Sequence, residues 1–75
     1  MPNERHKEQL IRFGKHLEKL RKSKDLSLRK LAQKCNIEHS DIKRYENGEI
    51  NLSFISILEL AEGLGVSLKE LMEFE

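Results

Sequence analysis

The stretch from Ser27 to Gly48, S-L-R-K-L-A-Q-K-C-N-I-E-H-S-D-I-K-R-Y-E-N-G, decides the fold of this chain. Near its start, apolar residues recur at the three- and four-residue spacing that lines one face of a helix: Leu28, Leu31, Ala32 and Cys35. Ser27 suits the N-cap of that helix, because its hydroxyl can accept a hydrogen bond from a free N–H of the first turn. The pattern predicts a helix of about nine residues, held by packing rather than by propensity.

A turn and a second helix follow. Asn36 stands where the chain has to change direction, and asparagine tolerates the left-handed backbone conformation better than most residues other than glycine. We expect the side chain of Ile37 to be buried in the core and to anchor this turn there. The next helix is expected from about Glu38 to Asn47, and Gly48 suits the position just beyond its end.

This second helix has one side that should be buried and one that should be open. At about 100° per residue, the buried side carries Ile42, Tyr45 and Glu46. The open side carries Ser40, Lys43, Arg44 and Asn47, with His39 at its border. A helix supported in this way has the right size to enter the major groove of duplex DNA.

The rest of the chain predicts three more helices, which gives an all-α fold of five helices. The first is expected from about Glu4 to Lys22, with an apolar stripe of Leu10, Phe13, Leu17 and Leu20. Gly14 inside it predicts close packing by a neighbouring helix. The fourth should run from about Ser53 to Gly63, and Ser67 with Glu70 forms a capping box that begins the fifth.

Apolar residues near the C-terminus exceed what one buried stripe needs, which predicts a second apolar surface. We interpret this surface as a homodimer interface formed by Leu58, Leu64, Leu71, Met72 and Phe74. The alternative is a larger core that the end of the chain covers.

The composition indicates one small domain, residues 1–75. Cys35 is the only cysteine, so no intrachain disulfide can form, as is usual in a reducing cytoplasm. No apolar run approaches the ~20 residues of a membrane helix, and the N-terminus lacks the apolar segment of a signal peptide. We expect a soluble, cytoplasmic protein.

The charges are strongly separated along the chain. Residues 1–34 contain 11 Lys or Arg and 4 Asp or Glu, a net of +7, whereas residues 35–75 contain 3 and 9, a net of −6. The basic half could lie along a phosphate backbone while the acidic half faces away or meets a partner. The alternative is a charged helical surface that serves solubility alone.

Specific residues at a joint spacing extend this pattern over most of the chain. They are Phe13-Gly14-Lys15, Leu17, Leu20-Arg21, Ser27, Leu31-Ala32, Ile37, Ile42, Glu46-Asn47-Gly48, Leu58, Leu60-Ala61 and Leu64-Gly65-Val66-Ser67-Leu68. On these residues the chain resembles the XRE group of helix-turn-helix regulators, which share the fold of phage repressors and Cro. Asn36-Ile37 and Asn51-Leu52-Ser53 are also similar to short stand-alone regulators, including controller proteins of restriction-modification systems.

The resemblance implies a lambda-repressor-like domain, with its helix-turn-helix regulator region over about 10–72. Its second and third helices, within 27–48, would bind DNA, and the protein would act as a homodimer on an inverted-repeat operator. Carried over by position, His39, Ser40 and Arg44 would contact base edges. The residues near phosphates would be Arg29, Lys30, Lys43, Asn47 and Asn51. The resemblance also implies a structural ion pair between Arg21 and Glu46.

Three residues depart from the pattern of the group. Leu28 replaces a polar residue, often Gln, that helps to bind phosphate, so Arg29 or Lys30 would have to substitute for it. Asn36 replaces a glycine at the turn. Glu38 replaces a Ser or Thr cap, and its carboxylate favours the helix dipole, repels phosphate and could accept from a cytosine amino group.

The leading hypothesis is therefore a sequence-specific regulator that acts as a repressor on double-stranded DNA. The alternative is a protein-interaction or antitoxin-like module on the same fold, with DNA binding secondary. An enzyme is not expected, because His6, His16 and His39 have no metal-ligand spacing with Cys35 and no phosphate-binding glycine loop is present. No cofactor and no metal are predicted.

Overall fold

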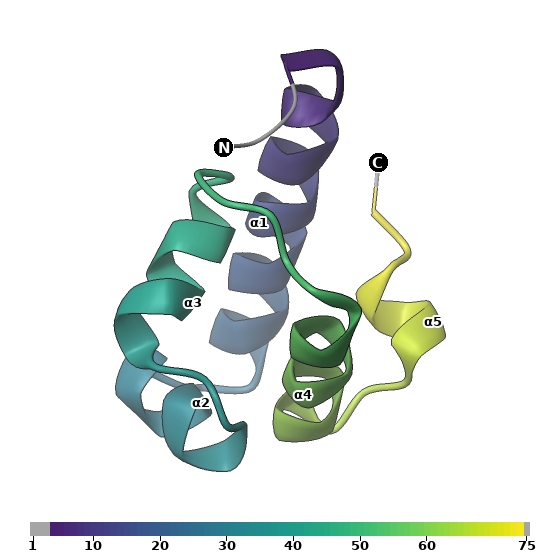
Figure 1. The fold of residues 1–75 in the computed structure, drawn as a ribbon. Coiled ribbons are helices and arrows are strands. Elements are labelled where there is room, and N and C mark those ends of the chain that lie inside the picture. The colour runs from purple at the N-terminus through teal and green to yellow at the C-terminus, as the bar shows by residue number, and fades with distance from the viewer. Residues whose placement is uncertain (1–3, 75) are drawn as a thin grey trace.

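The computed structural model describes residues 4–74, which are helical with no strand among them (Figure 1). Within this range a short 3-10 turn, Glu4–His6, precedes the five helices α1 Lys7–Ser23, α2 Leu28–Lys34, α3 His39–Glu46, α4 Phe54–Leu64 and α5 Leu68–Leu71. The prediction of an all-α, five-helix fold is confirmed. Among the described residues no helix is long and apolar enough to cross a membrane.

The helices begin where the sequence places serine caps. The hydroxyls of Ser27, Ser53 and Ser67 each accept a hydrogen bond from the backbone N–H three residues further on, at 3.0–3.1 Å. Each of these serines has an extended backbone, so its side chain reaches back over the first turn of the helix. Local sequence therefore sets the start of α2, α4 and α5.

The turn between α2 and α3 differs from the prediction. Helix α2 ends at Lys34, and Cys35 already has an extended backbone (φ −129°, ψ 157°) instead of being helical. Asn36 is not left-handed, because Asp25, in the loop after α1, is the one non-glycine residue of positive φ in the described chain. The change of direction is made by extended backbone at Cys35, which removes the need for a left-handed residue at Asn36.

One core joins all five helices. In Figure 1, α2 and α3 lie to the left of α1, and α4 and α5 lie to the right. The fully buried large side chains come from all five helices, namely Leu17, Leu31, Ile42, Leu60 and Leu71. Phe13, Cys35, Tyr45, Ala61 and Leu64 complete the buried apolar set.

Gly14 allows α1 and the end of α3 to touch. A Cβ atom at this position would overlap the backbone carbonyl groups of Tyr45 and Glu46. The predicted close packing is therefore confirmed, and it explains why a residue that costs a helix about 1 kcal/mol relative to alanine stands inside α1. Just beyond the same end of α3, Gly48 adopts φ 71°, as expected for the residue that follows the C-cap of a helix.

Some of the apolar residues near the C-terminus belong to the core, and others are exposed as a dimer interface would require. Leu64 and Leu71, assigned from the sequence to a dimer interface, are 4% and 0% exposed, so that assignment is wrong for both. Phe74 is half-buried and stacks edge-on against Phe13 at 5.7 Å between ring centroids, so the chain end does cover part of the core. Leu58 and Met72 are exposed, as the interface interpretation requires.

Candidate nucleic-acid interface

Helix α3 presents a continuous polar surface. Ile42 and Tyr45 are buried, which turns the opposite side of this eight-residue helix to solvent. On that side His39, Ser40, Lys43 and Arg44 are exposed, and so is Asn47 at the C-cap. These are the residues for which the sequence predicted DNA contacts, and the structure brings them onto one face.

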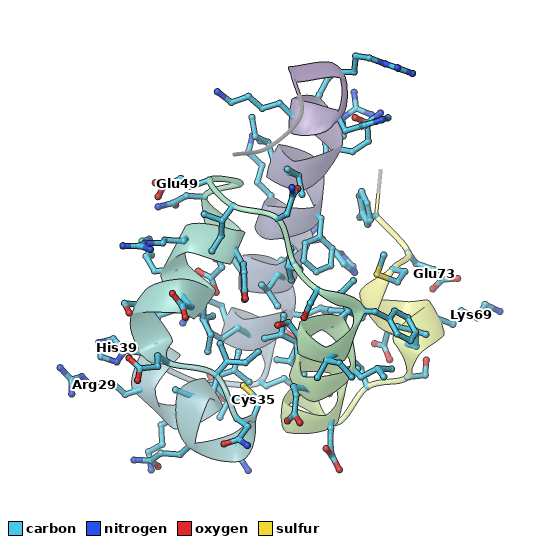
Figure 2. The ribbon with its side chains drawn as sticks, in the orientation of Figure 1. Arg29, Cys35, His39, Glu49, Lys69 and Glu73 are labelled. Atoms are coloured by element: carbon cyan, nitrogen blue, oxygen red, sulfur yellow. The ribbon has the colours of Figure 1, made fainter. Side chains whose placement is uncertain are left out.

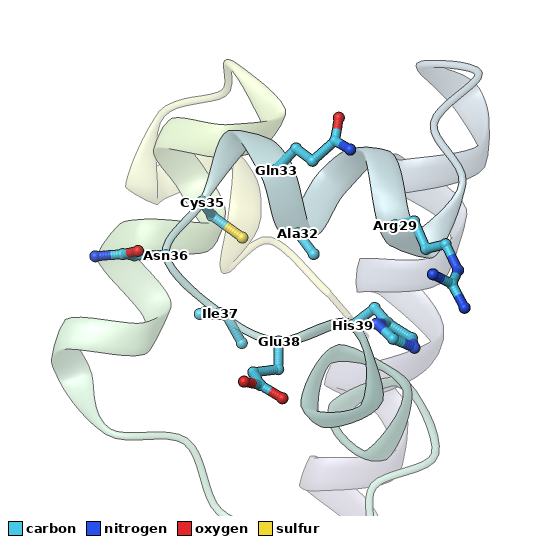
Figure 3. A pocket seen from close by; sticks show the side chains of 8 residues that line it. All are labelled: Arg29, Ala32, Gln33, Cys35, Asn36, Ile37, Glu38 and His39. Atoms are coloured by element: carbon cyan, nitrogen blue, oxygen red, sulfur yellow. The ribbon is translucent and has the colours of Figure 1, made fainter.

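Helix α2 adds the cation Arg29 beside this face. Arg29 and Lys30 lie in its first turn, and both are exposed. An open groove of about 580 Å³ separates α2 from the start of α3; its lining residues are Arg29, Ala32, Gln33, Cys35, Asn36, Ile37, Glu38 and His39. Figure 3 shows that Arg29 and His39 extend to the same side of this groove, whereas Asn36 points the opposite way.

Glu38 keeps an unused carboxylate at the mouth of the groove. It is the N-cap residue of α3, yet its side chain makes no cap hydrogen bond, and it is exposed. Its backbone carbonyl accepts from the N–H groups of Asp41 and Ile42 instead. The carboxylate therefore remains available as an acceptor on a surface that is otherwise basic.

Two asparagines occupy different surroundings. The Nδ2 atom of Asn47 donates to Oε2 of Glu49 at 3.2 Å, so its amide is already oriented beside the end of α3. Asn51 borders another groove, of about 230 Å³, together with Phe13, Met72 and other residues of the N- and C-terminal segments. The structure does not bring Asn51 together with the groove that Arg29 and His39 line.

A buried ion pair fixes α3 to α1. Nε of Arg21 donates to Oε2 of Glu46 at 2.6 Å and its Nη2 donates to Oε1 at 3.1 Å. The hydrogen bonds to Glu46 raise the pKa of Arg21 against the opposing effect of its burial. Because both residues are buried, they support the orientation of α3 and are not themselves presented to a ligand.

Among the described residues the cations of this surface form no ion pair, although Glu18 lies near enough to Lys43 for the two charges to attract each other. Ion pairs of the described residues join Arg12 to Glu8, Lys22 to Glu18 and Arg21 to Glu46, and they leave Arg29, Lys30, Lys43 and Arg44 without one. In Figure 2, Arg29 and His39 project from the edge of the molecule opposite Lys69 and Glu73. Unpaired cations on one face are the electrostatic footprint of phosphate binding.

Sequence reasoning missed residues on α4. Phe54 and Ile55, which were not assigned to any surface, are 62% and 66% exposed. A helical projection of α4 would have placed Ile55 opposite the buried Leu60 and Leu64. No contact was predicted for Glu59, but its Oε1 accepts the backbone N–H of Asn36 at 3.2 Å. No local signal predicts that contact, since 23 residues separate the two.

Two helices joined by a four-residue turn, with the second held on its inner side and polar on its outer side, define a helix-turn-helix DNA-binding domain. The described residues contain no group of three His, Cys, Asp or Glu side chains arranged to hold a metal. A family model described as Helix-turn-helix matches residues 17–71, and the chain belongs to this family. Its relatives confirm the XRE-type group, whose members are DNA-binding regulators of transcription and not enzymes.

Curated relatives and solved structures agree with this family. Control protein C.MunI of a Mycoplasma species is 40% identical over 62 residues, which cover 81% of this chain and 84% of that protein. Control protein C.BamHI of Bacillus amyloliquefaciens is 35% identical over 63 residues, 83% of this chain and 78% of that protein. The crystal structure of the restriction-modification controller protein C.AhdI from Aeromonas hydrophila superposes with a TM-score of 0.83 at 36% identity, covering 85% of this chain and 97% of that one.

The fold is also shared by a more distant structure. The clp gene regulator ClgR from C. glutamicum has a TM-score of 0.77 at 22% identity, covering 83% of this chain and 80% of that one. At this identity the likeness shows a common fold and no more.

Proposed function

We propose that this protein is a sequence-specific regulator that binds an inverted-repeat operator in duplex DNA as a homodimer and represses transcription by occupying that operator. The observation that carries the proposal is the outer face of α3, where Ser40, Lys43 and Arg44 are exposed together. Lys43 and the cations of α2 would displace counterions from phosphates, which gives affinity without sequence preference. Repression by occupancy needs no group beyond the DNA-binding surface and the dimer contact.

Sequence preference would come from the side chains at base edges. Arg44 is exposed and has no ion pair on this face, and its guanidinium can make two hydrogen bonds to guanine. His39 and Ser40 extend the face toward the N-terminus of α3. Glu38 lies beside them with a free carboxylate, which suits the amino group of cytosine and disfavours a close phosphate.

The dimer contact is proposed on the outer sides of α4 and α5. Five large apolar side chains are exposed there: Phe54, Ile55, Leu58, Leu68 and Met72. An apolar cluster of this kind in a small domain marks an interaction surface. Met72 continues it into the apolar groove beside Phe13 and Phe74. Two copies joined here would present two α3 helices about 34 Å apart, one turn of DNA.

The relatives suggest which genes to test first. Two are control proteins, and one solved structure is a restriction-modification controller protein. We therefore propose that the operator lies upstream of restriction and modification genes, and that the protein acts in the cytoplasm where such DNA is found.

Selection from a random pool of DNA duplexes tests the proposal. We expect an enriched palindromic consensus whose binding weakens steeply between low and moderate salt, because phosphate contacts release counterions. A folded, dimeric protein that enriches no sequence would contradict the proposal and favour the protein-interaction module. A protein with Lys43 and Arg44 both changed to Glu separates the two: DNA binding should be lost, while an interaction through α4 and α5 would persist.

A further inference from the structure

The turn between α2 and α3 is attached to α4 by a side chain. Oε1 of Glu59, on α4, accepts the backbone N–H of Asn36, in the turn, at 3.2 Å. The side chain of Asn36 takes no part in this contact and points away from the groove beside α3 (Figure 3). What α4 holds is therefore the backbone of the turn.

This exposed N–H takes its acceptor from outside the motif. Cys35 still donates to the carbonyl of Leu31, as in a helix, but its own backbone is extended, so the next residue leaves the helical path. Ile37 donates back to the carbonyl of Cys35 at 2.9 Å. Asn36 lies between these two bonds, and the carboxylate of Glu59 supplies the partner that neither helix offers.

A second contact holds the same turn against α4. Gly63 lies one helical turn after Glu59, and a Cβ there would come within 3.0 Å of Cβ of Cys35 and 3.2 Å of Cδ1 of Leu31. The backbone of α4 thus approaches the end of α2 closely. Glu59 and Gly63 together fix both the distance and the rotation of α4 relative to the turn.

Helix α4 also carries the outward apolar side chains Ile55 and Leu58. Leu58 directly precedes Glu59. The proposed dimer contact and the hydrogen bond from Asn36 to Glu59 therefore belong to one rigid helix. A shift of the turn against α4 would change the position of α3 relative to the axis that relates two subunits. The distance between two α3 helices determines which half-site separation a dimer can bind.

We propose that Glu59 is a positioning residue, which sets the half-site spacing of the operator by holding the Asn36 N–H and thereby the start of α3 in a fixed relation to the dimer contact. This inference rests on the proposed function, because it needs a homodimer that binds two half-sites. Glu59 itself lies on α4, outside the DNA-binding face, and acts through the backbone of the turn.

The test compares Glu59→Ala with Glu59→Gln. Both remove the charge, but only glutamine keeps an oxygen that can accept from Asn36, so their difference isolates the hydrogen bond. Dissociation constants are measured for duplexes with the selected half-site spacing, for duplexes with one or two base pairs more or fewer, and for a single half-site. The dimer dissociation constant and the circular dichroism spectrum are recorded for each protein.

We expect Glu59→Gln to keep the spacing preference of the wild type. Glu59→Ala should bind the preferred spacing about five- to tenfold more weakly, as for one lost hydrogen bond, while single half-site binding and dimerisation change little. An equal loss at every spacing and at the half-site would show a structural role only and overturn the inference.

The two proposals fail in different ways. A spacing preference that survives unchanged in Glu59→Ala overturns the inference alone, whereas a wild-type protein that binds no paired half-sites overturns the proposed function together with it.

Discussion

Arg21 holds Glu46 and the loop before α2 at the same time. Its Nε and Nη2 donate to the two oxygens of the Glu46 carboxylate, and its Nη1 donates to the carbonyl of Leu26 at 2.8 Å. One buried side chain of α1 thereby fixes the end of α3 and the approach to α2. The DNA-binding face depends on this arrangement although neither member of the pair belongs to it.

Replacement of Arg21 by methionine should destabilise the fold by about 3–5 kcal/mol, because the Glu46 carboxylate stays buried without a partner. The double variant Arg21→Met, Glu46→Leu should be more stable than the single one, since no charge is left uncompensated. Urea unfolding followed by circular dichroism measures both. A single variant that loses less than the double one would contradict the importance of the pairing.

Gly14→Ala should lower the free energy of unfolding by about 1–3 kcal/mol, although alanine is the better helix former. Its Cβ would overlap backbone carbonyl groups of Tyr45 and Glu46, which cannot rotate away as a side chain would. Thermal unfolding gives the comparison. Lys15→Ala, at the exposed neighbouring position, is the control and should change stability little. A Gly14→Ala protein as stable as the wild type would show that α3 can move away.

Arg44→Ala and Lys43→Ala should weaken DNA binding in different ways. Loss of Arg44 should cost about 1–3 kcal/mol at the selected operator and relax the preference at one base pair. Loss of Lys43 should weaken all sequences alike and reduce the salt slope by about one. Fluorescence anisotropy at several salt concentrations distinguishes the two. Lys69→Ala, on the opposite edge of the molecule, should leave binding unchanged, and equal losses in all three variants would speak against the assignment (Figure 2).

Ile55→Glu and Leu58→Glu should each produce a folded monomer. Both side chains are exposed in the single chain, so a carboxylate there does not disturb the core, but it would be buried in the proposed interface. Sedimentation equilibrium measures the association, and operator affinity should fall with it. Gln33→Glu, exposed on α2, is the control for added charge and should leave the dimer intact. Variants that dimerise normally would show that Ile55 and Leu58 do not belong to the dimer interface.

Cys35 should make stability fall at alkaline pH. Burial raises the pKa of its thiol above the ordinary value of 9.0, with Glu59 adding to the shift and a hydrogen bond from Ile37 opposing it. A raised pKa in the folded state means that the stabilisation is complete below about pH 9, where the unfolded thiol is still protonated, and is lost as the pH rises further.

Urea unfolding between pH 7 and 10.5 tests this prediction when the wild type is compared with Cys35→Ala, which has no thiol to titrate. The difference between the two proteins should be constant at the lower pH values and shrink above about pH 9. A difference that grows with pH would mean that the thiolate is favoured in the fold.

The sequence predicted which segments are helical better than it predicted the turns and loops between them. Ser27 and Ser67 cap helices as expected, because an N-cap acts on residues within one turn of itself. Ser53, where the fourth helix was expected to begin, caps that helix as well. The end of α2 was misplaced, since the spacing of Cys35 fits a helical face whether or not its backbone is helical. The polar face of α3 was predicted residue by residue, whereas the placing of Asn51 beside another groove depends on a loop that no periodicity describes.

By itself, the sequence determined which residues share a face of each helix, because the period of the α-helix depends only on neighbouring residues. Only the tertiary structure decided which apolar face is inside: Leu64 is buried and Ile55 is exposed on the same helix, since α4 meets the rest of the core on one side. It alone also brought Glu59 to Asn36. Such contacts join residues far apart in the chain, and the packing of whole helices, which no local pattern encodes, sets their distance.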